Sequence, residues 1–217
     1  MDRRDHQSPQ GGGGGDTTRI LVEFLEVAIN TIVFLKGVYP SGAFERRRYM
    51  NVVVQRARHP QLKDYIHSSV KALQPFIQKG LVERVAVIFF NNESIPAERF
   101  VFKFIVNKFY GSDVEAASLE FSLRSFLVKL LVSEPFTKVL PSDCRWEITA
   151  YFRTFPQEAT TSKETHLWIP TDTKQWHQPP LITPIKSMSS EPLSVQLYLE
   201  HPSLSEPKPQ REMKPRS

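Results

Sequence analysis

Cysteine is almost absent from this sequence, because Cys144 is the single example in 217 residues. One cysteine excludes an internal disulfide framework and any zinc site built from several thiolates. A chain without disulfides fits a reducing compartment. No histidine lies near Cys144 in the sequence, so we interpret it as a buried or idle thiol rather than a nucleophile.

Long apolar runs are also missing. The N-terminal sequence MDRRDHQSPQGGGGGD has no apolar segment of the kind found in signal peptides. The most apolar stretch, residues 20–35, is interrupted by Glu23, Glu26 and Asn30. A helix that spans a bilayer needs about 20 mostly apolar residues. We therefore expect a buried helix at 20–35 and no membrane segment.

The common catalytic and nucleotide-binding motifs are absent. There is no GxSxG, HExxH, P-loop or dinucleotide-binding turn, and the pentaglycine is not followed by Lys-Ser/Thr. The histidines are scattered at positions 6, 59, 67, 166, 177 and 201, without carboxylates at metal-ligand spacing. We predict no catalytic residues, no metal and no cofactor, and therefore a protein that is not an enzyme.

The composition fits one folded domain with polar ends. The chain is 40% hydrophobic and 24% charged, which allows a sizeable core. Residues 1–16 are polar with five consecutive glycines, and residues 201–217 are polar and proline-rich, so we expect disorder at both ends. The folded domain should span 17–200. A net charge of +5 permits contact with nucleic acid but does not establish it.

Hydrophobic periodicity predicts helices followed by antiparallel strands. Helices are expected at 17–37 and 60–80, the second bent near Pro75, and a third begins at Ser112, where Glu115 completes a capping box. The expected strands are 85–90 and 100–106, which form a hairpin, then 145–152 and 194–200. Helices packed on an antiparallel sheet give an α+β class.

The stretch ERRRYMNVVVQRAR, residues 45–58, places five arginines around a short apolar run. Such a cluster could contact phosphates or an acidic partner. It could also be a solvated loop and an edge strand protected by charge. The second interpretation is favoured, because the arginines do not interleave with aromatic side chains as they do in base-stacking sites.

The segment from residue 166 to residue 200 combines two tryptophans with five prolines. Prolines interrupt helices and inner strands, so we expect this segment to run along a sheet edge or over a surface. It is either a crossover that fills the sheet or a mobile strap that closes over an added peptide strand. The residues alone support both equally. Its last strand, SVQLYLE, turns Gln196 and Tyr198 away from its apolar face, where a partner could meet them.

Several motifs occur together in a recognisable order: VEFLEVAINTIVFLKGVYP, HPQLKDYI, ERFVFKF, SLRSFLVKL, PIKSMSS and VQLYLE. They resemble HORMA-domain proteins, and most closely the non-catalytic accessory subunits of translesion DNA polymerase zeta. The resemblance covers about residues 20–200. It implies a HORMA domain of three helices packed on an antiparallel sheet, with a C-terminal safety belt at about 153–200.

The resemblance also implies a function and its site residues. The protein would be a nuclear adaptor in DNA damage tolerance whose belt traps a proline-containing peptide of the polymerase catalytic subunit. Tyr65 and Trp168 would line the peptide channel. A second surface would bind the C-terminal domain of the Y-family inserter polymerase. This surface would comprise Leu181 (or Ile182), Gln196 and Tyr198.

Two further contacts are implied by the family. Arg124, in SLRSFL, would lie at a HORMA–HORMA dimer contact, although the sequence alone favours an exposed helix charge. An AAA+ remodeller would open the belt. The alternatives are a HORMA adaptor of the spindle checkpoint, of the meiotic axis or of another repair complex. A DNA binder built on the arginine cluster is a further alternative, although we expect no sequence-specific nucleic-acid binding. An unrecognised hydrolase has the least support, because no nucleophile and base converge.

Overall fold

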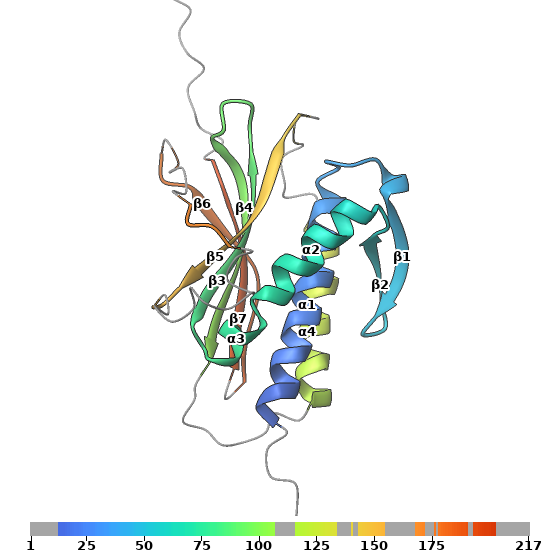
Figure 1. Ribbon diagram of the computed structural model, residues 1–217, viewed down its shortest axis with the longest axis vertical. Coiled ribbons are helices and arrows are strands. Elements are labelled where there is room, and N and C mark those ends of the chain that lie inside the picture. Colours follow the sequence, from blue (N-terminus) through green and yellow to red (C-terminus); the bar gives the residue numbers. More distant parts are fainter. Residues whose placement is uncertain are drawn as a thin grey trace, which may run out of the picture.

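The computed structural model describes residues 13–106, 116–133, 140, 143–154, 168–171, 176, 178–190 and 193–202. Helices cover one face of a five-stranded antiparallel sheet, and a two-stranded hairpin lies on the far side of the helices (Figure 1). The helices are α1 (Gly13–Leu35), α2 (Pro60–Ala72), α3 (Gln74–Gln78) and α4 (Ala116–Leu131), with a 3-10 turn at Ser41–Ala43. The strands are β1 (Phe44–Tyr49), β2 (Val52–Ala57), β3 (Val82–Phe90), β4 (Pro96–Val106), β5 (Arg145–Phe152), β6 (Leu181–Ser190) and β7 (Leu193–His201). The predicted α+β class is confirmed.

Helix α1 is central to the helical layer. Phe24, Leu25, Ile29 and Ile32 are fully buried, because α1 packs against α2, α3, α4 and β2. A helix that is apolar on most sides needs neighbours on most sides. The helix begins at Gly13, earlier than the expected residue 17. Glycines weaken a helix, but an acidic side chain in the first turn favours its N-terminus. Asp16 supplies that charge.

The second expected helix is divided into α2 and α3 at Leu73. Pro75 lies in the first turn of α3, where its missing N–H is tolerated, whereas inside a continuous helix it would remove a hydrogen bond. Gly80, with φ of 65°, follows α3 and allows the chain to turn into β3. The predicted bend at Pro75 is therefore confirmed.

The large sheet has the strand order β5-β3-β4-β7-β6. Strand β3 is buried on both faces, as its unbroken apolar sequence predicts. Val85, Val87 and Phe89 join the core beneath the helices, while Ala86 and Ile88 join a smaller cluster on the other face. The expected hairpin of β3 and β4 is confirmed.

The C-terminal hairpin β6–β7 adds to the β4 side of the sheet, which makes β6 an edge strand. The register between β6 and β7 shifts between Pro184 and Lys186. Proline cannot donate to a ladder and is tolerated at edges and bulges, so the expected edge position is confirmed. In β7 the buried Val195, Leu197 and Leu199 alternate with more exposed residues, as predicted.

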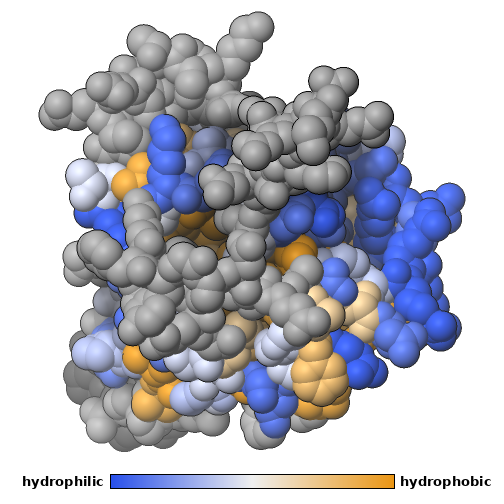
Figure 2. Space-filling model, turned by 90° about the horizontal axis from the view of Figure 1, so that it is seen from below, coloured by the Kyte–Doolittle hydropathy of each residue, from blue (hydrophilic) through white to orange (hydrophobic). Residues whose placement is uncertain are grey.

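The hairpin β1–β2 is fastened to α1 by Asn30. Its side-chain oxygen accepts a hydrogen bond from the Ala57 backbone N–H at 2.8 Å, and its amide donates to the Glu26 carbonyl at 2.8 Å. The two-residue turn has positive φ at Met50 (45°) and Asn51 (58°), which matches the twist of a hairpin. Figure 2 shows hydrophilic side chains on the side of the molecule where this hairpin lies.

Two predictions fall on residues outside the described part of the chain. They are the capping box of Ser112 and Glu115, and the disorder of residues 1–12 and 203–217. The expected disorder of residues 13–16 and 201 is wrong, because they belong to α1 and β7. The belt expected at 153–200 is described at 153–154, 168–171, 176, 178–190 and 193–200.

Candidate functional site

Strand β5 has an open edge in the described part of the structure, because it pairs with β3 alone. The Ile148 backbone N–H donates a hydrogen bond to the Tyr65 hydroxyl at 3.1 Å, so this N–H points away from β3. Backbone groups alternate between the two edges of a strand, so those of Trp146 and Ala150 face the same open edge. This edge can accept another strand.

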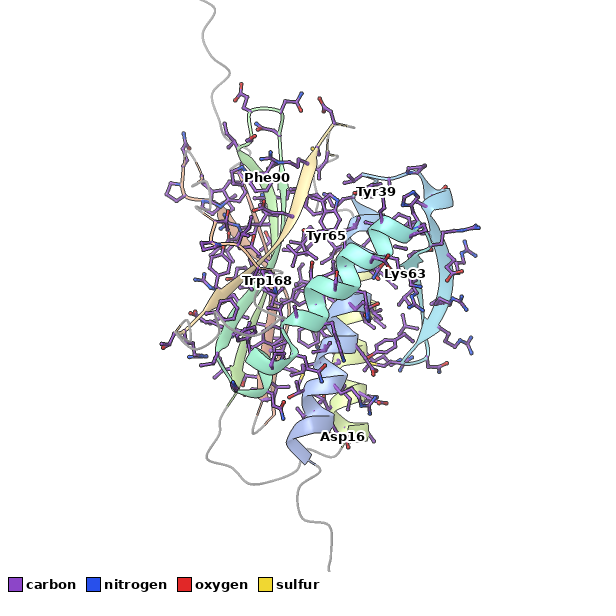
Figure 3. All side chains as sticks on the ribbon, viewed as in Figure 1. Asp16, Tyr39, Lys63, Tyr65, Phe90 and Trp168 are labelled. Atoms are coloured by element: carbon purple, nitrogen blue, oxygen red, sulfur yellow. The ribbon has the colours of Figure 1, made fainter. Side chains whose placement is uncertain are left out.

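A group of aromatic side chains lies beside the open edge. The Tyr65 ring of α2 meets the Trp146 ring edge-on, with centroids 5.4 Å apart. The Trp146 indole donates to the Tyr39 hydroxyl at 3.1 Å. Figure 3 shows Tyr65 pointing from α2 toward the sheet. Tyr39 and Trp146 were not among the predicted site residues, and only the fold brings them beside Tyr65.

The environment of Tyr65 keeps its phenol protonated. Burial raises the pKa of Tyr65 above its ordinary value, and the nearby Glu147 carboxylate raises it further. The hydrogen bond from the Ile148 N–H acts in the opposite direction. A protonated hydroxyl that already accepts one hydrogen bond keeps its own proton to donate to a second group at the edge.

Trp168 lies at the margin of the core. Its ring is partly buried against the main core cluster, while Ile169 beside it is 82% exposed. The indole Nε1 of Trp168 is buried and has no hydrogen-bond partner among the described residues. A buried donor without a partner is unfavourable, so this N–H is suited to a carbonyl supplied from outside.

The belt residues are distributed over both faces of the sheet. Trp168 packs on the helix-covered side, whereas the Trp176 ring lies 5.7 Å from the guanidinium carbon of Arg99. Arg99 also forms an ion pair with Glu200 at 3.0 Å, on the face opposite the helices. The described residues of the segment expected to form the belt therefore lie on both faces of the sheet.

The second predicted surface coincides with a cleft of about 760 Å³ at the β6–β7 hairpin. Ile182, Gln196 and Tyr198 line it, with Lys103, Lys129 and Lys186 around them. The β6–β7 register pairs Ile182 with Glu200, on the face of Tyr198, and pairs Leu181 with His201, on the other face. The structure thus brings the alternative Ile182, and not Leu181, beside Gln196 and Tyr198.

Tyr198 is anchored rather than free. Its ring packs on the small cluster of Ala86, Ile88, Phe90 and Val101 on the face opposite the helices. Burial raises the pKa of the Tyr198 phenol, and the carboxylate of Glu200 adds to this effect. The side chain therefore presents a neutral hydroxyl from a fixed ring.

Arg124 lies on the outer side of α4 and is half-buried rather than fully exposed. Its Nε is buried without a hydrogen-bond partner in the described part of the chain. On the same helix Phe121 is 73% exposed and Val128 46%, and Val132, directly after the helix, is 54% exposed. This exposed apolar surface beside Arg124 was not predicted, although the apolar residues could have been found by plotting the helix.

The described residues contain no group of three or more side chains that could hold a metal ion. They also contain no helix that is long and apolar enough to cross a membrane. Three surfaces are instead suited to another protein chain: the open β5 edge can pair with a strand, and the β6–β7 cleft and the outer face of α4 can receive side chains.

Known proteins resemble this chain in sequence and in fold. Residues 18–165 match the HORMA domain. The DNA polymerase zeta processivity subunit of Arabidopsis thaliana is 61% identical over 207 residues, covering 95% of this chain and 94% of the relative. The mitotic spindle assembly checkpoint protein MAD2B of Danio rerio is 34% identical over 187 residues, covering 83% and 89%.

Solved structures share the fold at low sequence identity. A chain of the mitotic checkpoint complex has a TM-score of 0.72 at 15% identity and covers 89% of this chain and 99% of its own. HTP-2 of C. elegans, bound to HTP-3 closure motif 1, has a TM-score of 0.71 at 8% identity and covers 87% of both chains. The domain match and the two close relatives show that this chain belongs to the HORMA domain family.

Proposed function

We propose that this protein is a non-catalytic adaptor subunit of translesion DNA polymerase zeta that acts in the nucleus. The identity of 61% with a polymerase zeta processivity subunit supports this assignment. Its role is to hold the catalytic subunit and present a separate surface to a Y-family inserter polymerase. The described fold runs from Gly13 in α1 to His201 in β7, slightly beyond the expected 17–200, and the safety belt is taken to span about 153–200.

The observation that carries the proposal is the open edge of β5 beside Tyr65, with Trp168 at the margin of the core under the helices. An extended segment of the catalytic subunit adds to β5, and the belt closes over it. The trapped segment contains proline, and proline supplies no backbone donor. Aromatic rings at the groove and the Trp168 indole N–H suit such a ligand, because they contact its apolar rings and its carbonyls.

The inserter polymerase binds at the β6–β7 cleft through its C-terminal domain. Ile182, Gln196 and Tyr198 are proposed as the contact residues, with Ile182 in place of Leu181 because of the strand register. The cleft and the β5 edge belong to opposite edges of the same sheet. Both polymerases can therefore be held at once.

Two further partners belong to the proposal. A second HORMA protomer docks on α4 at Arg124, where exposed apolar side chains provide the contact area. An AAA+ remodeller opens the belt to release its client, since a wrapped ligand dissociates slowly.

A second candidate function is an adaptor of the spindle checkpoint. The name of the Danio rerio relative, a mitotic spindle assembly checkpoint protein, favours it. The same belt and edge would then trap a checkpoint client. The two candidates differ in the client and not in the mode of capture.

Crosslinking mass spectrometry of the protein purified from its own cells distinguishes these candidates. Lys63 lies on α2, near Tyr65, and Lys103 and Lys186 line the β6–β7 cleft. A peptide of the polymerase catalytic subunit joined to Lys63 is the expected result. A checkpoint protein at Lys63 would select the second candidate. A catalytic-subunit peptide joined only to Lys103 or Lys186 would contradict the placement of the channel.

A further inference from the structure

The net positive charge of this protein is concentrated in one short stretch. Residues 44–63 contain five arginines and one lysine but only one carboxylate, that of Glu45. The net charge of this stretch equals the +5 of the whole chain, so the rest of the chain is neutral in sum. This stretch forms the β1–β2 hairpin and the start of α2.

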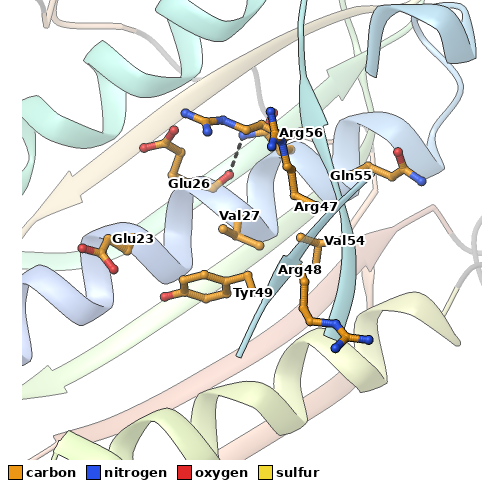
Figure 4. A pocket seen from close by; sticks show the side chains of 10 residues that line it. Glu23, Glu26, Val27, Arg47, Arg48, Tyr49, Val54, Gln55 and Arg56 are labelled. Carbon is orange, nitrogen blue, oxygen red and sulfur yellow. Dashed lines mark hydrogen bonds between the residues drawn. The ribbon is translucent and has the colours of Figure 1, made fainter. Parts of the chain in front are cut away.

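The two faces of the hairpin differ in what they expose. Val52 and Val54 are buried toward α1. The register pairs Arg46 with Gln55 and Arg48 with Val53, so these residues share the opposite face. Both arginines are exposed, and Arg48 extends away from Glu23 and Glu26 in Figure 4. The hairpin thus carries two outward guanidinium groups on one face.

The inward face is different, because its arginines are next to acids. Arg47 is within 2.8 Å of the Glu45 carboxylate. Arg47 and Arg56 also line a cleft of about 380 Å³ together with Glu23 and Glu26. Arg48 contributes to the wall of this cleft as well, but its guanidinium extends away from both glutamates (Figure 4). The glutamates would repel an anion in that cleft. An anionic partner therefore meets the outward face, where neither arginine has an ion-pair partner among the described residues.

We propose that the outward face of β1–β2, with Arg46 and Arg48, binds the phosphate backbone of duplex nucleic acid without reading its sequence. Guanidinium groups match phosphate oxygens in geometry and keep their charge at all physiological pH values. Residues two apart on a strand are about 7 Å apart, so the two arginines reach separate phosphates. Arg58, whose backbone is held at Ala43, extends the basic surface at the end of β2.

Nucleic acid fits this face better than an acidic protein. Protein interfaces depend on buried aromatic or large apolar anchors, and Val53 is the only exposed large apolar side chain of the hairpin, since Phe44 is buried in the core. Tyr49 pairs with Val52 and lies on the inward face, so it is not placed to stack on bases. Contacts to phosphates carry no sequence information.

The hairpin lies on the far side of the helices from the sheet (Figure 1). Nucleic acid on β1–β2 would therefore not compete with a peptide at β5 or a partner at the β6–β7 cleft. This binding site goes beyond the adaptor function and does not depend on it.

The test is fluorescence anisotropy of a short labelled DNA duplex of mixed sequence, measured with the full chain over a series of salt concentrations. The variant Arg46→Ala/Arg48→Ala removes two charges from the outward face. The control Lys71→Ala/Lys79→Ala also removes two exposed charges. Lys71 lies on α2, and Lys79 directly follows α3. Each lost phosphate contact lowers the magnitude of the slope of log affinity against log salt concentration by about 0.9. This magnitude should therefore fall by about 2 in the arginine variant and by about 0 in the lysine variant.

Equal losses in the two variants would reduce the effect to net charge and overturn the proposal. The proposal would also be overturned if the wild-type chain bound a polyglutamate peptide at low salt but did not bind the duplex. Dimers in the wild type that dissociate in the arginine variant, with duplex affinity unchanged, would instead assign the face to a second copy. An unchanged thermal midpoint in both variants controls for folding, and peptide capture measured in parallel tests the adaptor function separately.

Discussion

At the scale of single residues, the candidate site depends on hydrogen-bonding groups that the fold leaves partly used. The Tyr65 hydroxyl accepts from Ile148, and the Trp168 indole N–H is buried without a partner among the described residues. The sequence predicted both residues by resemblance. It did not predict their partners, because Tyr65 and Ile148 are 83 positions apart and only the packing of α2 on β5 joins them.

Tyr65→Phe should lower the free energy of unfolding by about 1 kcal/mol, the usual net value of one hydrogen bond. The phenylalanine keeps the ring contact with Trp146 but cannot accept from the Ile148 N–H. Urea denaturation measures the difference. A loss above about 3 kcal/mol would mean that the hydroxyl has a larger structural role than this contact.

Trp168→Ala should weaken capture of the catalytic-subunit peptide by roughly thirtyfold, or about 2 kcal/mol. The substitution removes both the ring and the orphaned donor, while Trp168→Phe removes the donor and keeps most of the ring area. Calorimetric titration of the peptide measures both variants. An alanine variant that is folded and binds with unchanged affinity would contradict the assignment of Trp168 to the channel.

The β6–β7 register makes a matched pair of variants available. Ile182→Ala should weaken binding of the inserter polymerase domain, because Ile182 lines the cleft with Tyr198. Leu181→Ala, one residue away, should leave that binding unchanged, because Leu181 belongs to the other face. Surface plasmon resonance with the inserter domain compares them. The reverse order of effects would restore the placement of Leu181 on this surface.

At the scale of secondary structure, α1 is joined to the middle of the sheet by a buried ion pair. Lys36, just after α1, lies 2.5 Å from the Glu98 carboxylate of β4, with both side chains almost fully buried. Neither residue was singled out from the sequence, since a lysine and a glutamate far apart in the chain give no local signal. The pair fixes the position of α1 relative to β4.

Lys36→Met should cost about 3–5 kcal/mol of stability, because it removes the buried ammonium group that neutralises the Glu98 carboxylate. The double variant Lys36→Met/Glu98→Leu removes both charges and should recover much of that loss. Thermal and urea unfolding of the three proteins gives the coupling between the two sites. Additive losses in the double variant would contradict an interacting pair.

Elements with a strong local pattern were predicted closely, and elements fixed by tertiary contacts were not. The β3–β4 hairpin follows from its apolar run and turn residues. The start of α1 does not, because a helix can extend into glycines when its remainder is firmly packed. The arginine stretch was interpreted as a solvated loop and edge strand, and it forms a two-stranded hairpin whose turn at Met50 and Asn51 was not recognised.

At the scale of the whole molecule, the order of the strands decides what the domain can hold. The C-terminal hairpin occupies the β4 side of the sheet, and this leaves β5 at the other edge. A sequence gives alternation within each strand but not which strands are neighbours, so β5 could not be identified as the open edge from periodicity alone. The family resemblance supplied the idea of a belt, and the strand order supplies the place where a peptide can add.

Hydrogen exchange of the full chain, with and without a proline-containing peptide of the catalytic subunit, tests this account most directly. The backbone N–H groups of Trp146 and Ala150 face the open edge of β5, so their exchange should slow strongly when the peptide is bound. Strand β3, already paired on both sides, should change little and serves as the internal reference. A peptide that binds tightly while β5 exchanges at its original rate would contradict strand addition at this edge.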